Sequence, residues 1–345
     1  MLAVWLICMA GAHATALDVD RPDVRLFIAH VAQQDSFSSH RLRKLLKAAQ
    51  SQESIIEAMD RPAEKAKLWY EYRAIFVNEK RIEEGVEFWT LHRAELERAS
   101  AATGVPAEYI VAILGVETYY GRLTGRYRVL DALATLAFDY PARAKFFQDE
   151  LEQFLILSRE AAIDPLTAMG SYAGAMGAPQ FMPSTYRHFA VDADHDGRID
   201  LWTNWPDIFV SVGNYLREHG WNTGGPVLTD ASIERDSPET LDGRKLELAE
   251  TVASLRAQGI RFETALPGDA PVLLIAADEP DGIHWRVGYQ NFYTITRYNH
   301  SALYAMAVYE LAAAVKARLV PAENPPALAA PVSVPAAAPT PDPPS

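Results

Sequence analysis

The chain has 345 residues, of which 49% are hydrophobic and 22% charged, and its formal net charge is −13 at pH 7. This composition is ordinary for a folded protein of one or two domains and excludes bulk disorder. So acidic a chain lacks the basic surface that attracts phosphate backbones, which argues against nucleic acid as a partner. The single cysteine, Cys8, excludes a disulfide framework and a cysteine-based zinc site.

The two ends of the chain differ in composition from the rest. Residues 2–12 form an uninterrupted apolar run, and two overlapping A-x-A sites follow within residues 12–16. This arrangement is typical of a secretory signal peptide and is too short to span a bilayer; a buried N-terminal strand or helix is the alternative. Ile7 precedes Cys8 where a lipoprotein needs a small residue. Residues 321–345 are almost all proline, alanine and other small residues, which predicts a disordered tail.

Between these ends the pattern is first helical and then mixed. Apolar residues at helical spacing predict helices over residues 41–49, 63–76, 82–103, 107–119, 144–162, 207–219 and 302–318. From about residue 224 to 296, short apolar runs alternate with turns rich in proline, glycine and aspartate. They predict strands over 227–232, 272–277 and 284–289, and one helix over 246–258. The predicted fold class is mainly α, with a small α+β insert.

Glu117 is a lone acid in an otherwise apolar helical stretch. On helical periodicity it shares a face with Ile113 and Leu114, so it points toward the core side. A carboxyl in a partly desolvated apolar site has a raised pKa and can donate a proton near neutral pH. The structural alternative is a salt bridge to Arg122 or Arg126 at the helix end.

Two further segments have the composition of a ligand-binding surface. Residues 170–184 contain three glycines and two prolines, which permit close backbone approach, with Ser171 and Gln180 as polar groups. Ser171 lacks the glycines of a G-x-S-x-G hydrolase turn. Residues 288–304 interleave aromatic rings with amides and hydroxyls, which suits a carbohydrate. An ordinary loop and ordinary aromatic packing remain equally compatible with these two patterns.

Residues 192–200, DADHDGRID, match the start of an EF-hand calcium loop. Gly197 supplies the sharp turn, but position 12 holds Thr203 instead of the usual glutamate, and Asp207, a few residues on, is the candidate to close an enlarged loop. The expected ligands of a structural Ca²⁺ are the carboxylates of Asp192, Asp194, Asp196 and Asp207 and the carbonyl of Arg198. A solvated acidic turn is the alternative.

Taken together, these four segments resemble the lytic murein transglycosylase B family, glycoside hydrolase family 103. The resemblance runs from about Leu26 to Leu311 and is carried by GVETYYGR (115–122), AGAMGAPQFMPS (173–184) and NFYTITRYNHSALYAMAV (291–308). It implies a lysozyme-like helical core, a helical domain packed on it and a small domain with an antiparallel sheet. It also implies cleavage, without water, of the β-1,4 bond between N-acetylmuramic acid and N-acetylglucosamine in peptidoglycan.

The resemblance also implies roles for individual residues. Glu117 matches the single catalytic acid of the family, and the metal loop matches its calcium loop. The positions that match sugar-binding residues are Ser171, Gln180, Tyr215, Tyr298, Asn299 and Tyr304. Ordinary glycosidases use two carboxylates, whereas the catalytic segment here offers one, which fits substrate assistance. Glu117 then acts first as acid and afterwards as base, and the product is a 1,6-anhydro sugar. The alternatives are a hydrolytic lysozyme and a non-catalytic peptidoglycan-binding protein, which would be expected to lose Glu117.

The same considerations divide the chain into segments. They are a signal peptide (1–16), an N-terminal helical domain (17–105), a lysozyme-like core (106–223, with its loop at 192–207), a small α+β domain (224–287), a return to the core and helical domain (288–320) and the tail (321–345). We expect an exported, soluble periplasmic monomer without a lipid anchor or a transmembrane segment in its mature form. Its expected partner is the peptidoglycan glycan strand, and no organic cofactor is expected.

Overall fold

The computed structural model describes residues 14–60, 67–233 and 241–319. The helices are α1 (Pro22–Gln34), α2 (Ser39–Lys47), α3 (Glu53–Asp60), α4 (Trp69–Phe76), α5 (Glu79–Leu91), α6 (Arg93–Thr103), α7 (Ala107–Thr118), α8 (Val129–Asp139), α9 (Ala144–Glu160), α10 (Pro183–Phe189), α11 (Trp205–Glu218), α12 (Val252–Ala257), α13 (Gln290–Tyr298) and α14 (Ala302–Arg318). The strands are β1 (Ala14–Ala16), β2 (Gln50–Gln52), β3 (Tyr127–Arg128), β4 (Met169–Gly170), β5 (Leu228–Ile233), β6 (Glu250–Thr251), β7 (Ile260–Arg261), β8 (Pro271–Glu279) and β9 (Gly282–Gly288). The predicted mainly α class with a small antiparallel sheet is confirmed.

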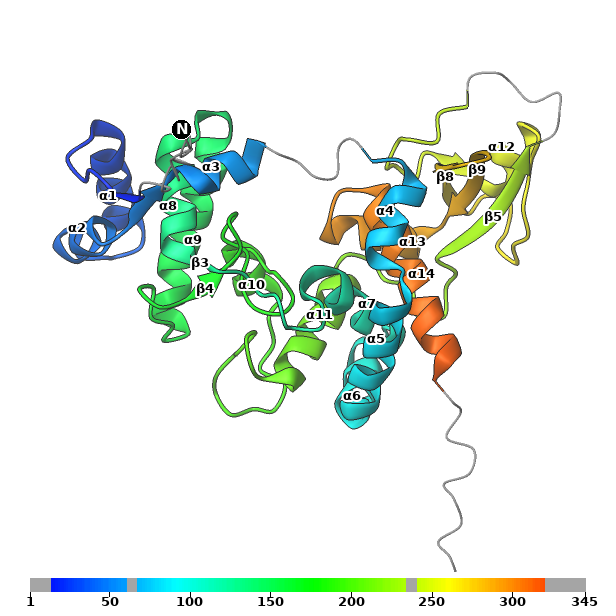
Figure 1. Cartoon of the computed structure of the whole chain (residues 1–345), viewed down its shortest axis with the longest axis horizontal. Helices are drawn as coiled ribbons and strands as arrows, with labels where there is room; N and C mark the ends of the chain where they lie inside the picture. The colour runs from blue at the N-terminus through cyan, green and yellow to red at the C-terminus, as the bar shows by residue number, and fades with distance from the viewer. Residues whose placement is uncertain (1–13, 61–66, 234–240, 320–345) are drawn as a thin grey trace, which may run out of the picture.

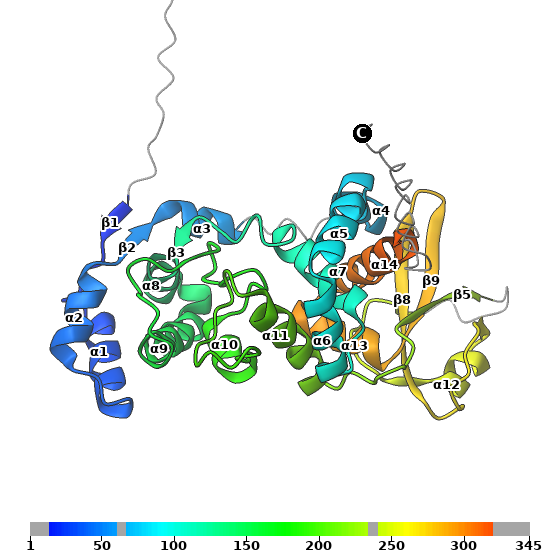
Figure 2. The same cartoon turned by 90° about the horizontal axis from the view of Figure 1, so that it is seen from below.

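The molecule is elongated, with helices at one end and the larger sheet at the other. Figures 1 and 2 agree that α1, α2, α3, α8 and α9 gather at the first end, while α7 and α11 lie between them and the sheet. The predicted N-terminal domain of residues 17–105 is divided between the two ends. Helix α3 packs on α8, whereas α4, α5 and α6 pack on α14, α7 and α11. The predicted tail and most of the predicted signal peptide lie outside the described residues.

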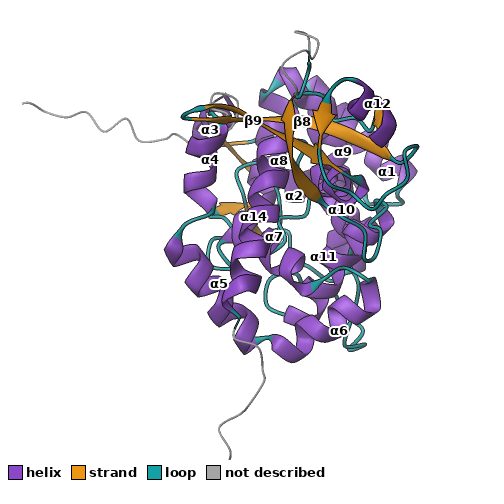
Figure 3. Cartoon of the chain, turned by 90° about the vertical axis from the view of Figure 1, so that its right-hand side faces the viewer, coloured by secondary structure: helices purple, strands orange, loops and turns teal. Residues whose placement is uncertain are grey.

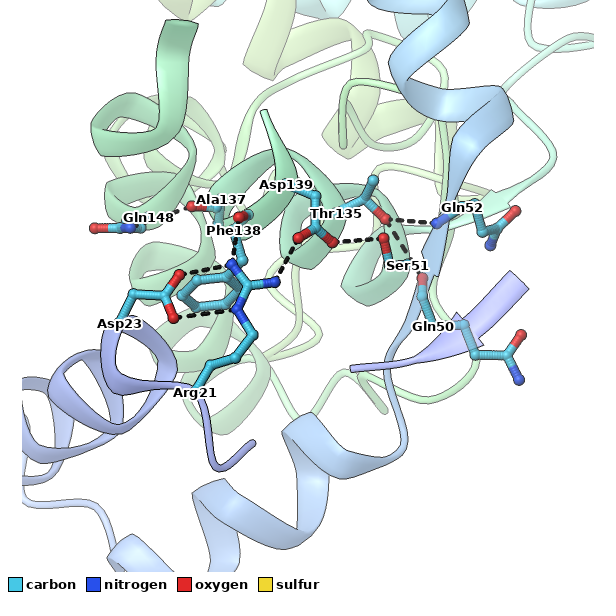
Figure 4. A network of polar contacts seen from close by, with 10 residues as sticks. All are labelled: Arg21, Asp23, Gln50, Ser51, Gln52, Thr135, Ala137, Phe138, Asp139 and Gln148. Carbon is cyan, nitrogen blue, oxygen red and sulfur yellow. Dashed lines mark hydrogen bonds and ion pairs between the residues drawn. The ribbon is translucent and has the colours of Figure 1, made fainter. Parts of the chain in front are cut away.

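A polar network fastens the N-terminal segment to α8 (Figure 4). The Arg21 guanidinium donates to Asp139 at 2.5 Å and to the Phe138 carbonyl at 2.6 Å, while Ser51 donates to the other Asp139 oxygen at 2.6 Å. Hydrogen bonds donated to the Asp23 and Asp139 carboxylates raise the pKa of Arg21, so its positive charge is retained. These charge-assisted bonds hold α1 and β2 against the C-terminal end of α8.

Three of the predicted helices differ in the structure. The helix expected over 82–103 is broken at His92, where the ring turns inward and packs 5.0 Å from Trp205 and 5.5 Å from Phe209. Aromatic burial at this point outweighs continuation of the helix. The helix expected over 246–258 begins only at Val252, because Thr251 caps it by accepting the Ser254 amide. Of the helix expected over 63–76, residues 63–66 lie outside the described residues and α4 begins at Trp69; Trp69 and Tyr72 are buried, whereas Leu68 and Ile75 are exposed.

The larger sheet has strand order β6-β8-β9-β5-β7, and every pair in it is antiparallel. Figure 3 looks at the molecule from this end, where the orange strands gather near the top of the view. The sheet and α12 enclose a small core of their own, which includes Val252, Leu255 and Val287. The last strand, β9, leads directly into α13, so the insert returns the chain to the helical core immediately before the tyrosines of α13 and α14.

Helix α7 occupies the centre of the main core. Its residues from Ile110 to Val116 are all buried, and it packs against α14, α5, α6 and α11. A helix that is apolar on every side is stable only when other elements surround it. The position of α7 is therefore set by burial, and its final turn carries Glu117 to the edge of the core.

Candidate active site

Glu117 is half-buried in the last turn of α7, between the fully buried Val116 and Thr118. Tyr304, in the first turn of α14, donates its hydroxyl to Glu117 Oε1 at 2.7 Å. This contact joins two residues that are 187 positions apart in the sequence. The two arginines considered as alternative partners are engaged elsewhere: Arg122 pairs with Glu84 at 2.8 Å, and the Arg126 guanidinium lies 5.6 Å from the Tyr127 ring.

The chain leaves α7 through a strained turn. Tyr119, Tyr120 and Gly121 have φ values of 54°, 61° and 83°, all in the left-handed region. For bulky residues this conformation is a true outlier and persists only where the surroundings hold it. The Tyr120 hydroxyl donates to the Arg81 carbonyl at 2.7 Å, and the Arg81 guanidinium lies 4.4 Å from the Tyr119 ring. Arg81 also donates to the Gly115 carbonyl, so α5 holds the end of α7.

Three of the predicted sugar-binding tyrosines lie side by side. The rings of Tyr298 and Tyr304 are stacked at 6.3 Å, and the rings of Tyr215 and Tyr298 meet edge to face at 4.9 Å. Burial raises the pKa of Tyr298 and Tyr304 well above the ordinary value, and the Glu117 carboxylate adds to both shifts. Burial raises the pKa of Tyr215 to about 12. These phenols therefore stay protonated at neutral pH, and Tyr304 remains a hydrogen-bond donor to Glu117.

One more tyrosine belongs to this group. Tyr72 of α4 is 1% exposed and lies close enough to Tyr304 to contribute to the raised pKa of that phenol. From the sequence alone, its place in the helix predicted over residues 63–76 indicated only packing in the core.

The polar groups of the predicted binding loop hold the loop itself together. Ser171 Oγ accepts the amides of Ala173 and Ala175 at 3.2 and 3.0 Å. Gln180 Nε2 donates to the carbonyls of Thr124 and Gly177 at 3.1 and 2.9 Å. The Tyr298 hydroxyl donates to the Pro179 carbonyl at 2.6 Å, which ties this loop to α13. Asn299 is half-buried at the C-terminal end of α13.

Glycine is required at one point of this loop by close packing. Gly177 has a φ of 66°, and a Cβ atom there would lie 2.2 Å from the Leu201 carbonyl oxygen. The next residue, Ala178, donates its amide to the same Leu201 carbonyl at 2.8 Å. The backbone approach expected from the glycines is therefore made, at this position, toward the metal loop.

The predicted metal loop brings three carboxylates together. Ligand atoms of Asp192, Asp194 and Asp196 all lie within 4.8 Å of one another. Asp192 Oδ1 is buried without a hydrogen-bond partner, whereas its Oδ2 accepts the Gly197 amide at 3.0 Å. A hydrogen bond from Asn204 lowers the pKa of Asp194, which favours its charged form. Clustered charged oxygens with one orphaned acceptor fit a hard cation such as Ca²⁺.

Asp207 lies at the base of this loop and is fully buried. Its two carboxylate oxygens accept the amides of Ala193 and Asp200 at 2.8 and 2.9 Å. Burial raises the pKa of Asp207 in spite of these two bonds. Asp207 thus anchors both ends of the loop through the backbone, and its role as a metal ligand stays a prediction.

The chain is similar in sequence and in structure to known proteins. Residues 20–313 match the family described as the transglycosylase SLT domain. Over 305 residues the chain is 40% identical to the membrane-bound lytic murein transglycosylase B of Escherichia coli (strain K12), a match that covers 86% of this chain and 83% of that relative. The catenated lytic transglycosylase SltB1 of Pseudomonas aeruginosa superposes with a TM-score of 0.83 at 48% identity, covering 86% of this chain and 98% of the other. The lytic transglycosylase Slt35 of Escherichia coli, in complex with calcium, superposes with a TM-score of 0.79 at 39% identity. This match covers 89% of this chain and 96% of the other.

The mainly helical fold is that of lysozyme-like lytic transglycosylases, and it places the Glu117 acid at the end of a buried helix in contact with Tyr304. The chain belongs to the transglycosylase SLT domain family and is a lytic murein transglycosylase, an enzyme that acts on peptidoglycan. In the described part of the chain, no unbroken helix has the length and apolar character to cross a membrane; only α6 and α7 taken together do, and they are bent by 112°.

Proposed function

We propose that the enzyme cleaves the β-1,4 bond between N-acetylmuramic acid and N-acetylglucosamine without water and leaves 1,6-anhydromuramic acid ends. Glu117 is the only residue assigned to proton transfer. The observation that carries this proposal is the contact between Tyr304 and Glu117 Oε1, at the end of a buried apolar helix. The proposed sugar-binding residues are Ser171, Gln180, Tyr215, Tyr298, Asn299 and Tyr304.

The proposed reaction has two proton transfers. Protonated Glu117 first gives its proton to the glycosidic oxygen as the bond to C1 of the muramic acid breaks. The N-acetyl oxygen of the same sugar supports the positive charge that develops at C1. Glu117, now a carboxylate, then takes the proton of the C6 hydroxyl, and that oxygen bonds to C1 and closes the anhydro ring. Glu117 ends protonated, as it began.

The surroundings of Glu117 favour this route over hydrolysis. The side chains that the structure places near Glu117 include Tyr298 and Tyr304, whose raised pKa keeps both phenols protonated, so neither of them supplies a base to activate water. The donated bond from Tyr304 fixes the rotation of the carboxyl group and stabilises the carboxylate that forms midway. A hydrolytic lysozyme would require a second group to orient water.

The product distinguishes the two reactions. We expect muropeptides released from purified peptidoglycan to be lighter at the muramic end than hydrolytic products by the mass of one water. Borohydride should leave them unchanged, because an anhydro ring has no reducing end. Mass spectrometry before and after reduction measures both properties, with a muramidase digest as the control. Products that borohydride reduces would show hydrolysis instead.

We also propose that the loop of residues 192–207 binds a structural Ca²⁺. Asp192, Asp194 and Asp196 would hold the ion through their carboxylates, with the Arg198 carbonyl and Asp207 as the further predicted ligands. The ion supplies the positive charge that allows three carboxylates to lie together. Calcium in the complex of the relative Slt35 supports this choice of cation.

We infer that the enzyme is exported to the periplasm as a soluble protein, with residues 1–16 as its signal peptide. The apolar run of residues 2–12 and the nature of the substrate support this, although the Escherichia coli relative is named membrane-bound. Residues Ala14–Ala16 pair with β2 as β1 in the full chain, and cleavage before Leu17 would remove this strand. We expect mass spectrometry of the periplasmic protein to give Leu17 as its first residue. If Thr15 is found as the first residue, cleavage occurs after Ala14 instead. An intact N-terminus would contradict export by this segment.

A further inference from the structure

We propose that Thr118 is a positioning residue for Glu117, which holds the end of α7 against the loop of residues 170–184. The inference rests on the assignment of Glu117 as the acid. Thr118 directly follows Glu117 in the chain, and it is 1% exposed. The residues of α7 from Ile110 to Val116 are buried and apolar, and Thr118 places a hydroxyl directly beside the acid that follows them.

The Thr118 hydroxyl makes bonds in two directions. Oγ1 donates to the Ala178 carbonyl at 2.8 Å and accepts the Gly121 amide at 3.0 Å. The Leu114 carbonyl, one turn back in the same helix, lies farther away at 3.4 Å. A threonine inside a helix ordinarily bonds to the carbonyl one turn back. Here the shorter bond leaves the helix and reaches a loop 60 residues later in the chain.

The bond to Gly121 acts on the strained turn that follows the acid. Tyr119, Tyr120 and Gly121 are consecutive residues in the left-handed region, a conformation that other contacts must maintain. The Gly121 amide at the end of this turn is held by Thr118 Oγ1. Without that acceptor the turn can relax, and the last helical residues, Glu117 among them, can relax with it.

The bond to Ala178 acts on the loop that is proposed to bind the sugar. The neighbouring carbonyl of Pro179 accepts the Tyr298 hydroxyl at 2.6 Å, so the two sides of the site hold adjacent points of one loop. Thr118 thereby sets the distance between the acid and this loop. Catalysis by an acid requires hydrogen-bond reach to the leaving oxygen, and a misplacement of about 1 Å can cost roughly 100-fold in rate.

The test compares variants that keep or remove the hydroxyl. Thr118→Val keeps the branched shape but has no hydroxyl, and we expect kcat on a soluble GlcNAc–MurNAc oligomer to fall roughly 100-fold with little change in KM. Thr118→Ser should restore most of kcat, because it keeps the hydroxyl. Thr103→Val is the matched control: Thr103 ends α6, is 4% exposed and donates to the Ala99 carbonyl at 2.7 Å, away from the proposed site.

Each outcome decides between positioning and mere stability. If Thr118→Val lowers only the melting temperature, as Thr103→Val should, and keeps kcat, the inference is wrong. If Thr118→Val does not fold, Thr118→Ala and Thr118→Ser replace it, since both lack the methyl group and differ only in the hydroxyl; equal kcat values would overturn the inference. Glu117→Gln separates the two proposals, because an active Glu117→Gln enzyme refutes the acid assignment itself.

Discussion

Glu117→Gln is expected to abolish turnover of peptidoglycan while leaving the fold intact. Glutamine can still accept the Tyr304 hydroxyl through its amide oxygen, so the contact at Glu117 Oε1 can be kept. It has no acidic proton to give and no carboxylate to receive one, so both proposed transfers are lost. General acid–base catalysis typically contributes 10²- to 10⁴-fold, and a loss of at least roughly 10³-fold in kcat is expected. Turbidity decrease of a peptidoglycan suspension and muropeptide release measure it.

Glu108→Gln is the matched control for this experiment. Glu108 lies in the first turn of the same helix, is buried and pairs with Lys316 at 2.6 Å. Its replacement removes a carboxylate from α7 without touching the proposed site, so kcat should change little even if the melting temperature falls. Retention of activity in Glu117→Gln, with an unchanged circular dichroism spectrum, would place the acid elsewhere.

Calcium is expected to raise the melting temperature of the protein. A ligand that binds only the folded state at 100 times its dissociation constant adds about 2.7 kcal/mol to the free energy of unfolding. For a chain of this size that corresponds to roughly 5 °C. Asp196→Ala removes a carboxylate of the group formed with Asp192 and Asp194, so it should abolish the rise. Melting curves with calcium and with chelator measure both effects.

Asp281→Ala is the control for loss of an acidic side chain in a turn. Asp281 is an exposed residue between β8 and β9, and its Oδ1 lies 3.0 Å from His284 Nε2. Its loss should leave the calcium-dependent rise in melting temperature unchanged.

The activity of the folded protein should change little on chelation, because the Tyr304–Glu117 contact involves neither the loop nor its ligands. A melting temperature that does not change with calcium would show that the loop is a solvated acidic turn without a bound ion. Loss of activity on chelation with the fold intact would instead give the metal a part in the mechanism, contrary to this expectation.

The sequence by itself determined the elements whose pattern is local. Helix α14 has the predicted bounds, and the three predicted strands of the sheet lie within about two residues of β5, β8 and β9. Apolar residues that repeat with the period of a helix or strand must face a core, so burial selects the element from a short stretch of chain. The acidic spacing of residues 192–196 likewise brings three carboxylates together within one loop.

The tertiary structure alone decided what depends on distant partners. The break at His92 follows from rings contributed by Trp205 and Phe209, and the donor to Glu117 comes from Tyr304, at the other end of the folded chain. The sequence marks Thr118 only as a residue at the end of a helix. Its bond to the Ala178 carbonyl exists only because the fold places that loop beside it. Periodicity reports which face of a segment is buried, but not which segment covers it. The pairing of segments is set by the packing of the whole core, and the chemistry of this site lies in those pairings.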